Sequence, residues 1–295
     1  MNLAVIDIGS NAIRLQINRL AYFKGEAITK KLEFIRFPLR LGQDSFSLSR
    51  ILPNTEDKFV MLMEAFSLIM KLYEVKDYMI CATAAMREAN NGKEIVQRVY
   101  ERCGLRIEII DGDREAEVIN YAIAPYIDDN NYVHIDVGGG STELSLYVSR
   151  KKIASKSFKI GSVRLLEGTA RTDIWDKIEA WINKKIEGVK GEFFAVGTGG
   201  NINKIYSMKV DNPQKMITRK EVEGIRAMIS EYSLEERQAV LQLKEDRAEV
   251  ILPASEIYVK ILQIIGINTM FVPDVGLKDG MMECLYLRQL PYDAH

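Results

Sequence analysis

Two short segments of the sequence combine an aspartate with a glycine-rich stretch, a pattern that can bind anions. Asp-Ile-Gly-Ser-Asn begins at Asp7, Asp-Val-Gly-Gly-Gly-Ser-Thr-Glu begins at Asp136, and an apolar run typical of a strand precedes each aspartate. Glycine lets the chain turn tightly, so the backbone amides of such a turn can face a phosphate. The candidate phosphate-binding residues are Gly9, Ser10 and Asn11 in the first segment and Gly138, Gly139, Gly140 and Ser141 in the second. An ordinary hairpin turn is the alternative interpretation of each segment.

Carboxylates in the same two segments can supply the oxygen ligands that magnesium prefers. Asp7, Asp136 and Glu143 are therefore the candidate metal ligands. The chain has only two histidines, His134 and the last residue, His295. This leaves no material for a histidine-rich metal site or for a Ser-His-Asp triad that needs a spare base. Catalysis would have to rest on carboxylates, backbone amides and a hard divalent cation.

Three acidic residues and one arginine lie near the predicted ends of other strands. Asp113, Glu115 and Glu117 occupy the first turn of a predicted helix that follows a strand. Acidic residues favour helix N-termini through the macrodipole, so the spacing does not choose among the three. Arg87 begins a helix beside a strand end, where ligands often bind in α/β proteins, although most arginines lie on a solvated face.

A third glycine-rich segment, Gly-Thr-Gly-Gly-Asn at residues 197–201, joins a predicted strand to a predicted helix. Free amides at the start of that helix could bind a phosphate or lie under a nucleotide. Gly197, Gly199 and Gly200 are thus further candidate phosphate-binding residues, on a pattern that is weak by itself.

The elements that would position these residues alternate between strands and helices, which predicts an α/β fold. Predicted strands cover residues 3–7, 13–17, 34–41, 77–83, 106–110, 132–136, 143–148, 152–158, 192–196 and 269–272. Predicted helices cover residues 57–73, 87–103, 113–126 and 175–188, three further stretches up to residue 265, and a last helix from residue 277. The second half opens as the first does, with a strand, an Asp-Gly turn and a strand, which we interpret as an internal duplication.

Composition limits the class of protein. A chain of 295 residues with 47% hydrophobic residues exceeds the size at which one core usually divides, so two domains are expected. The net charge of −1 provides no global field for nucleic acid or a membrane surface. The cysteines Cys81, Cys103 and Cys284 are odd in number, widely spaced and without a Cys-x-x-Cys motif, which argues against a disulfide framework and a zinc knuckle. With no signal peptide and no apolar stretch of about 20 residues, we expect a cytoplasmic protein.

The order and coverage of the motifs resemble the exopolyphosphatase and guanosine pentaphosphate phosphohydrolase (Ppx/GppA) family. The resemblance runs through IDIGSNAIRL (6–15), RLGQ (40–43), ATAAMREANN (82–91), IDGDREAEVI (110–119), IDVGGGSTEL (135–144), IGSVRLLEG (160–168), VGTGGNINKI (196–205), DRAEVILPA (246–254) and VGLKDGM (275–281). It implies two ribonuclease H-like domains of the actin/hexokinase superfamily with an active site in an interdomain cleft. We expect the domains at residues 1–127, joined by a C-terminal helix at about 281–295, and at residues 128–280, in the short two-domain form of the family.

The resemblance also implies roles for individual residues. Glu115 matches the family's catalytic glutamate, which activates water, and Arg87 matches an arginine near the phosphate chain. Asp136 and Glu143 match positions associated with the cation and the catalytic site. The chain departs from the family in having Lys278 where arginine is frequent, and in having Asp-Arg after Gly112 in place of a more acidic pair. These departures concern substrate preference and leave the water-activating position intact.

The expected function is magnesium-assisted hydrolysis that releases terminal orthophosphate from inorganic polyphosphate, guanosine pentaphosphate or both. A kinase or ATPase of the same fold and a non-catalytic sensor of guanosine polyphosphates or nucleotides are the alternatives. No nucleic-acid or membrane partner is expected, and family analogy is compatible with a homodimer.

Overall fold

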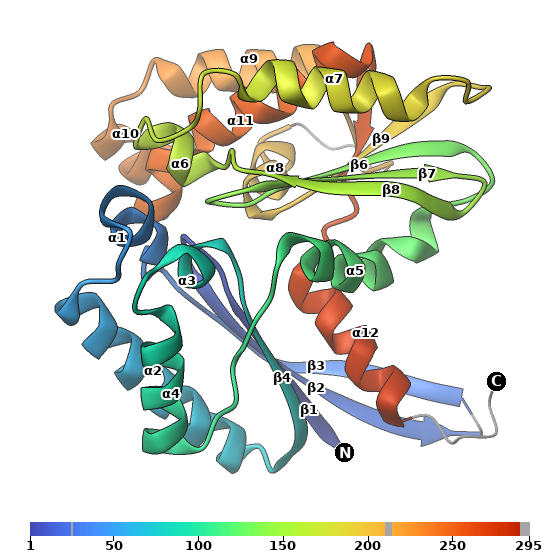
Figure 1. Cartoon of the computed structure of the whole chain (residues 1–295). Coiled ribbons are helices and arrows are strands. Elements are labelled where there is room, and N and C mark those ends of the chain that lie inside the picture. The colour runs from blue at the N-terminus through green and yellow to red at the C-terminus, as the bar shows by residue number, and fades with distance from the viewer. Residues whose placement is uncertain (25, 210–213, 290–295) are drawn as a thin grey trace. The chain divides into compact units, whose positions relative to one another are not determined.

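The structure is a computed structural model that describes residues 1–24, 26–209 and 214–289, and its chain contacts divide it into two units (Figure 1). Unit 1 comprises Met1–Ala122 together with Leu277–His295, and unit 2 comprises Ile123–Gly276. The sequence alone places these divisions after residue 127 and at about residue 281.

Unit 1 is a five-stranded sheet with helices on both faces. Its strands are β1 (Asn2–Ile8), β2 (Ile13–Phe23), β3 (Glu26–Phe37), β4 (Val75–Ala82) and β5 (Glu108–Ile109), in the order β3-β2-β1-β4-β5. Its helices are α1 (Leu41–Leu48), α2 (Pro53–Leu72), α3 (Ala84–Glu88), α4 (Gly92–Cys103), α5 (Gly112–Ile123) and α12 (Leu277–Gln289). Figure 1 shows α2 and α4 on one side of the sheet and α12 on the other.

The return of the chain into unit 1 is explained by the apolar face of α12. Leu277, Met281 and Leu285 recur every fourth residue and therefore lie on one side of the helix. They are buried with Leu3 and Val5 of β1 in a single hydrophobic cluster. Alternate residues of a strand point to opposite faces of the sheet. The residues of β1 that alternate with Leu3 and Val5 are therefore buried on the face that α2 and α4 cover.

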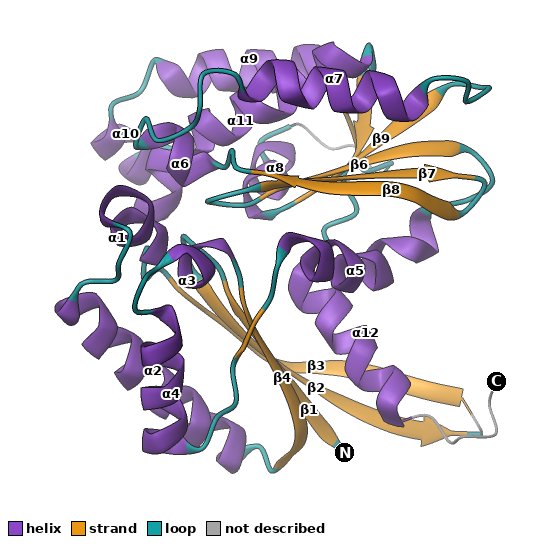
Figure 2. Ribbon diagram, in the orientation of Figure 1, coloured by secondary structure: helices purple, strands orange, loops and turns teal. Residues whose placement is uncertain are grey.

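Unit 2 is a six-stranded sheet, and its helices α7, α9 and α11 lie over one face (Figure 2). Its strands are β6 (Asn131–Val137), β7 (Thr142–Val148), β8 (Lys151–Phe158), β9 (Phe193–Thr198), β10 (Met216–Thr218) and β11 (Thr269–Phe271), in the order β10-β11-β9-β6-β7-β8. Its helices are η1 (Ala124–Tyr126), α6 (Ser162–Leu166), α7 (Ile174–Ile186), α8 (Gly200–Ser207), α9 (Arg219–Ser230), α10 (Leu234–Ala239) and α11 (Glu245–Ile265). Val133 and Ile135 of β6 pack with Ile178 of α7 and Ile257 of α11 in the main core.

The two sheets share a topology. In unit 1, β1 pairs antiparallel with β2, β2 antiparallel with β3, and β1 parallel with β4. In unit 2, β6, β7, β8 and β9 pair in the same four-strand pattern. The internal duplication inferred from the two Asp-Gly segments is therefore confirmed at the level of strand order and direction.

Several predicted elements need correction. The strand predicted at 34–41 is β3, which begins at Glu26 and ends at Phe37, and α1 then begins where the prediction still has a strand. The helix predicted at 87–103 is two helices, α3 and α4. The start of α4 packs closely on α3, since a Cβ at Gly92 would lie 2.2 Å from the carbonyl oxygen of Met86. Among the described residues, no helix is both long enough and apolar enough to cross a bilayer.

Candidate active site

The first Asp-Gly segment forms a tight turn between β1 and β2. The amide of Gly9 donates to the carbonyl oxygen of Ala12 at 3.2 Å, which closes the turn. Two carbonyl oxygens of the turn face the chain that follows β3, because Ser10 accepts from the Gly42 amide at 2.7 Å and Asn11 accepts from the Arg40 amide at 3.0 Å. The start of α1 therefore fixes the outer side of the turn.

The second Asp-Gly segment forms the equivalent turn between β6 and β7. The amide of Gly138 donates to the carbonyl oxygen of Ser141 at 3.0 Å. The amide of Ser162 donates to the carbonyl of Gly138 at 2.9 Å, and the carbonyl of Gly139 accepts from residues 163 and 164 at 2.9 and 3.0 Å. Within the part of the chain that the structure describes, no hydrogen bond is donated by the amides of Gly139, Gly140 or Ser141. These amides therefore have no acceptor among the described residues.

The close approach of α6 accounts for part of the glycine content of this turn. A Cβ on Gly161 would lie 2.4 Å from the carbonyl oxygen of Gly139, so no side chain fits there. The buried Arg164 adds a side-chain bond, since its Nε donates to the carbonyl oxygen of Gly140 at 2.9 Å. The sequence does not predict the hydrogen bond between Arg164 and Gly140, although Arg164 lies in one of the family-like segments.

Asp136 and Glu143 are direct cross-strand partners on β6 and β7. Opposed residues of an antiparallel pair project from the same face, so both carboxylates lie on one side of the sheet. Glu143 is 1% exposed, and its Oε1 accepts a hydrogen bond of 2.8 Å from the hydroxyl of Ser157, its partner on β8. Ser157 was absent from the predicted site because its place depends on strand register, which the local sequence does not display.

The same face of β6 carries His134, two residues before Asp136. Its ring is fully buried, and Nε2 makes a 2.8 Å hydrogen bond with the hydroxyl oxygen of Thr198 at the end of β9. Burial lowers the pKa of His134 from 6.5 to about 3, because a charged ring would lose its hydration, and the positive charge of Lys152 adds to the effect. His134 is therefore neutral and structural.

The third glycine-rich segment divides between a strand and a helix start. Gly197 lies inside β9, where a Cβ would be 2.4 Å from the sulfur of Met270, so the strand packs closely on this side chain. Gly199 has a φ of 114°, a conformation suited to glycine, and Gly200 is the first residue of α8. A Cβ on Gly199 would lie 3.2 Å from Oδ1 of Asp136, so this loop and the β6–β7 turn are neighbours.

Glu115 lies in the first turn of α5 in unit 1. Its side chain is about one-tenth exposed, and its Oε2 is 3.8 Å from a guanidinium nitrogen of Arg87. That nitrogen donates to the carbonyl oxygen of Ile110 at 2.6 Å, which holds the arginine beside the end of β5. Glu117, by contrast, pairs with Arg114 in a more exposed contact. Of these two acidic residues, Glu115 is the less exposed, and its carboxylate lies near Arg87 beside the end of β5.

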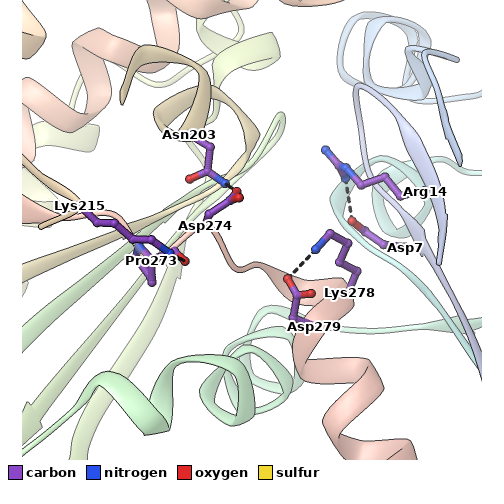
Figure 3. A network of polar contacts seen from close by, with 8 residues as sticks. All are labelled: Asp7, Arg14, Asn203, Lys215, Pro273, Asp274, Lys278 and Asp279. Atoms are coloured by element: carbon purple, nitrogen blue, oxygen red, sulfur yellow. Dashed lines mark hydrogen bonds and ion pairs between the residues drawn. The ribbon is translucent and has the colours of Figure 1, made fainter. Parts of the chain in front are cut away.

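Asp7 takes part in an ion pair that the sequence did not reveal. Its Oδ2 accepts a hydrogen bond of 2.7 Å from Arg14, its cross-strand partner on β2 (Figure 3). In the same unit, Lys278 at the start of α12 pairs with Asp279 at 2.6 Å. The negative charge of Asp7 is thus partly balanced within unit 1, which any role as a metal ligand must take into account.

Figure 3 also shows the contacts that secure the first turn of α8 in unit 2. Asn203 donates to Asp274 at 2.6 Å, and Lys215 donates to the carbonyl oxygen of Pro273 at 3.3 Å. The segment after β11 therefore braces the helix that begins at Gly200.

Within unit 1 the structure places the turn at residues 9–11, Arg87 and Glu115 after the carboxyl ends of three parallel strands, β1, β4 and β5. In unit 2 it brings together Asp136, Glu143, the turn and Gly199. Among the described residues, no group of three or more His, Cys, Asp or Glu side chains could hold a metal ion. Asp136 and Glu143 nevertheless suit magnesium, which usually takes one or two carboxylates and completes its coordination with water and substrate phosphates.

A family model described as the Ppx/GppA phosphatase family matches residues 29–288 of the chain. Exopolyphosphatase 1 of Mycobacterium leprae is 23% identical over 316 residues, covering 100% of this chain and 91% of that protein. The guanosine-5'-triphosphate,3'-diphosphate pyrophosphatase of Aliivibrio fischeri ES114 is 23% identical over 293 residues, covering 94% of this chain. The match spans 58% of that protein. Exopolyphosphatase 1 of Mycobacterium tuberculosis H37Rv is 26% identical over 167 residues, which cover 56% of this chain and 48% of that protein.

Solved structures show the same fold. The Aquifex aeolicus member of the Ppx/GppA family matches with a TM-score of 0.74 at 25% identity over 99% of both chains. An exopolyphosphatase from Cytophaga hutchinsonii matches with a TM-score of 0.81 at 20% identity over 97% of both chains. The predicted α/β fold with two domains of the actin type is confirmed.

Proposed function

The chain belongs to the Ppx/GppA phosphatase family, and from this premise we propose that it releases terminal orthophosphate from inorganic polyphosphate, guanosine pentaphosphate or both. The observation that carries the proposal is the combination in unit 2 of paired carboxylates with free turn amides. Asp136 and Glu143 project from one face, beside a turn whose amides at Gly139, Gly140 and Ser141 donate to no other described residue. Oxygen ligands beside amide donors suit a phosphoryl group with its divalent cation.

Glu115 is the proposed general base. A water molecule attacks the terminal phosphorus, its proton passes to the Glu115 carboxylate, and the bond from phosphorus to the bridging oxygen breaks. The products are orthophosphate and a substrate shortened by one phosphate. The low exposure of Glu115 supports this role, since a buried carboxylate beside Arg87 keeps a fixed orientation. Arg87 is the proposed contact for a phosphate of the chain.

Asp136 and Glu143 are the proposed ligands of magnesium, which when bound would offset negative charge on the phosphoryl oxygens. The bond from Ser157 orients the Glu143 carboxylate on the shared face. The amides of the β6–β7 turn donate to the same phosphoryl oxygens in the proposed arrangement, and so does the Gly200 amide at the start of α8. Fixed backbone donors stabilise charge without reorganising during the reaction.

Basic side chains in unit 1 support a substrate with several phosphates. Arg36 on β3 lies directly opposite Arg14 on β2, which in turn lies opposite Asp7. The ammonium groups of Lys31 and Lys278 are 5.7 and 5.8 Å from the ring centroid of Phe34. Both proposed substrates are polyanions, so these basic side chains favour a substrate with several phosphates. They do not distinguish polyphosphate from guanosine pentaphosphate, and that choice is left to experiment.

The test is a phosphate-release assay with long polyphosphate, short polyphosphate and guanosine pentaphosphate, each with magnesium and with no acceptor or nucleotide added. We expect release that stops when the cation is chelated. Asp136→Asn should reduce release, whereas Asp173→Asn, which alters an exposed ion pair of the same unit, should leave it unchanged. Binding of these ligands without release under any divalent cation would indicate a sensor. Transfer of a phosphoryl group from a nucleotide to an added acceptor, with no release from polyphosphate, would indicate a kinase.

A further inference from the structure

We propose that Tyr258 is a positioning residue whose hydroxyl joins the ends of β6 and β9 and thereby sets the position of Asp136. The proposal rests on the proposed function, because it assigns Asp136 to the cation. Tyr258 lies in the middle of α11 and is fully buried in the main core of unit 2.

The hydroxyl of Tyr258 makes two backbone contacts that lie in different strands. It donates to the carbonyl oxygen of Thr198 in a short hydrogen bond, and it accepts from the amide of Val137 at 3.3 Å. Val137 and Thr198 are the last residues of β6 and β9. The parallel ladder between these strands ends with the pair Asp136 and Thr198, so the hydroxyl continues the connection where the ladder stops.

Thr198 makes a second hydrogen bond, through its side chain, which further restricts the position of its carbonyl group. Its hydroxyl contacts Nε2 of the buried His134 at 2.8 Å. With the side chain held by β6 and the carbonyl held by α11, the backbone that leads into Gly199 has little freedom.

Gly199 connects this anchored point with Asp136. A Cβ on Gly199 would lie 3.1 Å from the Tyr258 hydroxyl, 3.1 Å from the carbonyl oxygen of Val137 and 3.2 Å from Oδ1 of Asp136. The hydroxyl and the carboxylate oxygen therefore approach the same point of the backbone from two sides. A shift of the β9 end would move Gly199 against Asp136, whereas the hydroxyl of Tyr258 prevents that shift.

A purely structural aromatic residue would not need the hydroxyl. Burying a hydroxyl is unfavourable unless it is hydrogen-bonded, and phenylalanine would fill the same apolar space. Burial and the nearby charges of Asp136 and Glu143 raise the pKa of Tyr258, so the phenol stays protonated and can donate to the carbonyl of Thr198.

The decisive variant is Tyr258→Phe in the full chain, compared with Tyr147→Phe. Tyr147 is a second buried tyrosine of unit 2, located on β7 in a different hydrophobic cluster, so it controls for the loss of a buried hydroxyl. Loss of an outer partner of a metal ligand typically weakens metal binding by about 10–100-fold. Binding of Mn²⁺ without substrate, measured by electron paramagnetic resonance, should weaken at least about tenfold in Tyr258→Phe and remain unchanged in Tyr147→Phe.

A kinetic readout accompanies the binding measurement. In Tyr258→Phe the magnesium concentration for half-maximal phosphate release should rise by the same factor, and saturating magnesium should restore most of kcat. Equal Mn²⁺ affinity in the two variants would overturn the proposal even if phosphate release were normal. Absence of phosphate release from the wild-type protein would instead refute the proposed function, since the Mn²⁺ comparison does not depend on turnover.

If Tyr258→Phe does not fold, the wild-type protein still provides a test. The Val137 amide lies beyond the β6–β9 ladder, and within the described part of the chain its hydrogen-bond acceptor is the Tyr258 hydroxyl. Its hydrogen exchange, followed by nuclear magnetic resonance, should be as slow as that of ladder amides in β6. Exchange at the rate of an open turn would overturn the proposal.

Discussion

Acid should destabilise unit 2 through His134, and the variant His134→Gln should remove this sensitivity. The pKa of His134 is lowered from 6.5 to about 3 in the folded protein, so the unfolded chain binds a proton that the native state does not. The stabilising effect of a lowered pKa is complete above pH 6.5 and is lost as the pH falls towards 3. At pH 5 the loss is about 2 kcal/mol, from about 1.5 pH units at about 1.36 kcal/mol each.

The assay is urea unfolding at pH 7 and pH 5, followed by tryptophan fluorescence. The only two tryptophans, Trp175 and Trp181, lie on α7 and pack against the main core of unit 2, so the signal reports on the unit that contains His134. Contributions of other titrating groups cancel in the difference between wild type and variant. We expect the free energy of unfolding of wild type to fall by about 2 kcal/mol more than that of His134→Gln. Equal falls would refute the conclusion that the ring is buried and neutral.

Two glycine substitutions test close backbone contacts. Gly161→Ala would place a Cβ 2.4 Å from the carbonyl oxygen of Gly139, so it should displace the β6–β7 turn, lower the kcat of phosphate release and cost about 1–3 kcal/mol of stability. Wild-type kcat in this variant would contradict the role of α6 in holding the turn. Gly280→Ala would place a Cβ 2.0 Å from the carbonyl oxygen of Val118, so calorimetry should show a lower melting temperature for unit 1. The matched control is Gly224→Ala in α9, where a Cβ meets no atom within 4 Å, and this variant should stabilise the helix by about 0.5–1 kcal/mol. If the Gly280→Ala protein were as stable as this control, the close contact between Gly280 and Val118 would be contradicted.

The elements that the sequence predicts well are those with local signals. The strands before Asp7 and Asp136 are continuous apolar runs that end in a turn motif, and both occur where predicted. The helix predicted at 57–73 has its apolar residues at helical spacing and corresponds to α2. Glu115 was chosen over its acidic neighbours by resemblance alone, since the macrodipole favours any of them.

Elements that depend on distant contacts escaped prediction. Helices α1 and α6 begin where backbone amides reach carbonyl oxygens of the preceding turns, as between Ser162 and Gly138, and no local pattern marks such bonds. Most of β3 is exposed and carries charges such as Lys30 and Lys31, so pairing with β2 holds it rather than a buried apolar face. Gly197 lies in a strand and packs on Met270, although its sequence context suggested a phosphate loop.

The most direct test of the account compares Glu115→Gln with Glu117→Gln in magnesium-dependent phosphate release. The two residues lie two positions apart in α5, and the Glu117 carboxylate is the more exposed partner in a surface ion pair. We predict that Glu115→Gln lowers kcat by about 10²-fold or more with little change in KM, because a general base acts only in the transition state. Glu117→Gln should retain wild-type kinetics. Wild-type turnover in Glu115→Gln would contradict the assignment of the water-activating carboxylate.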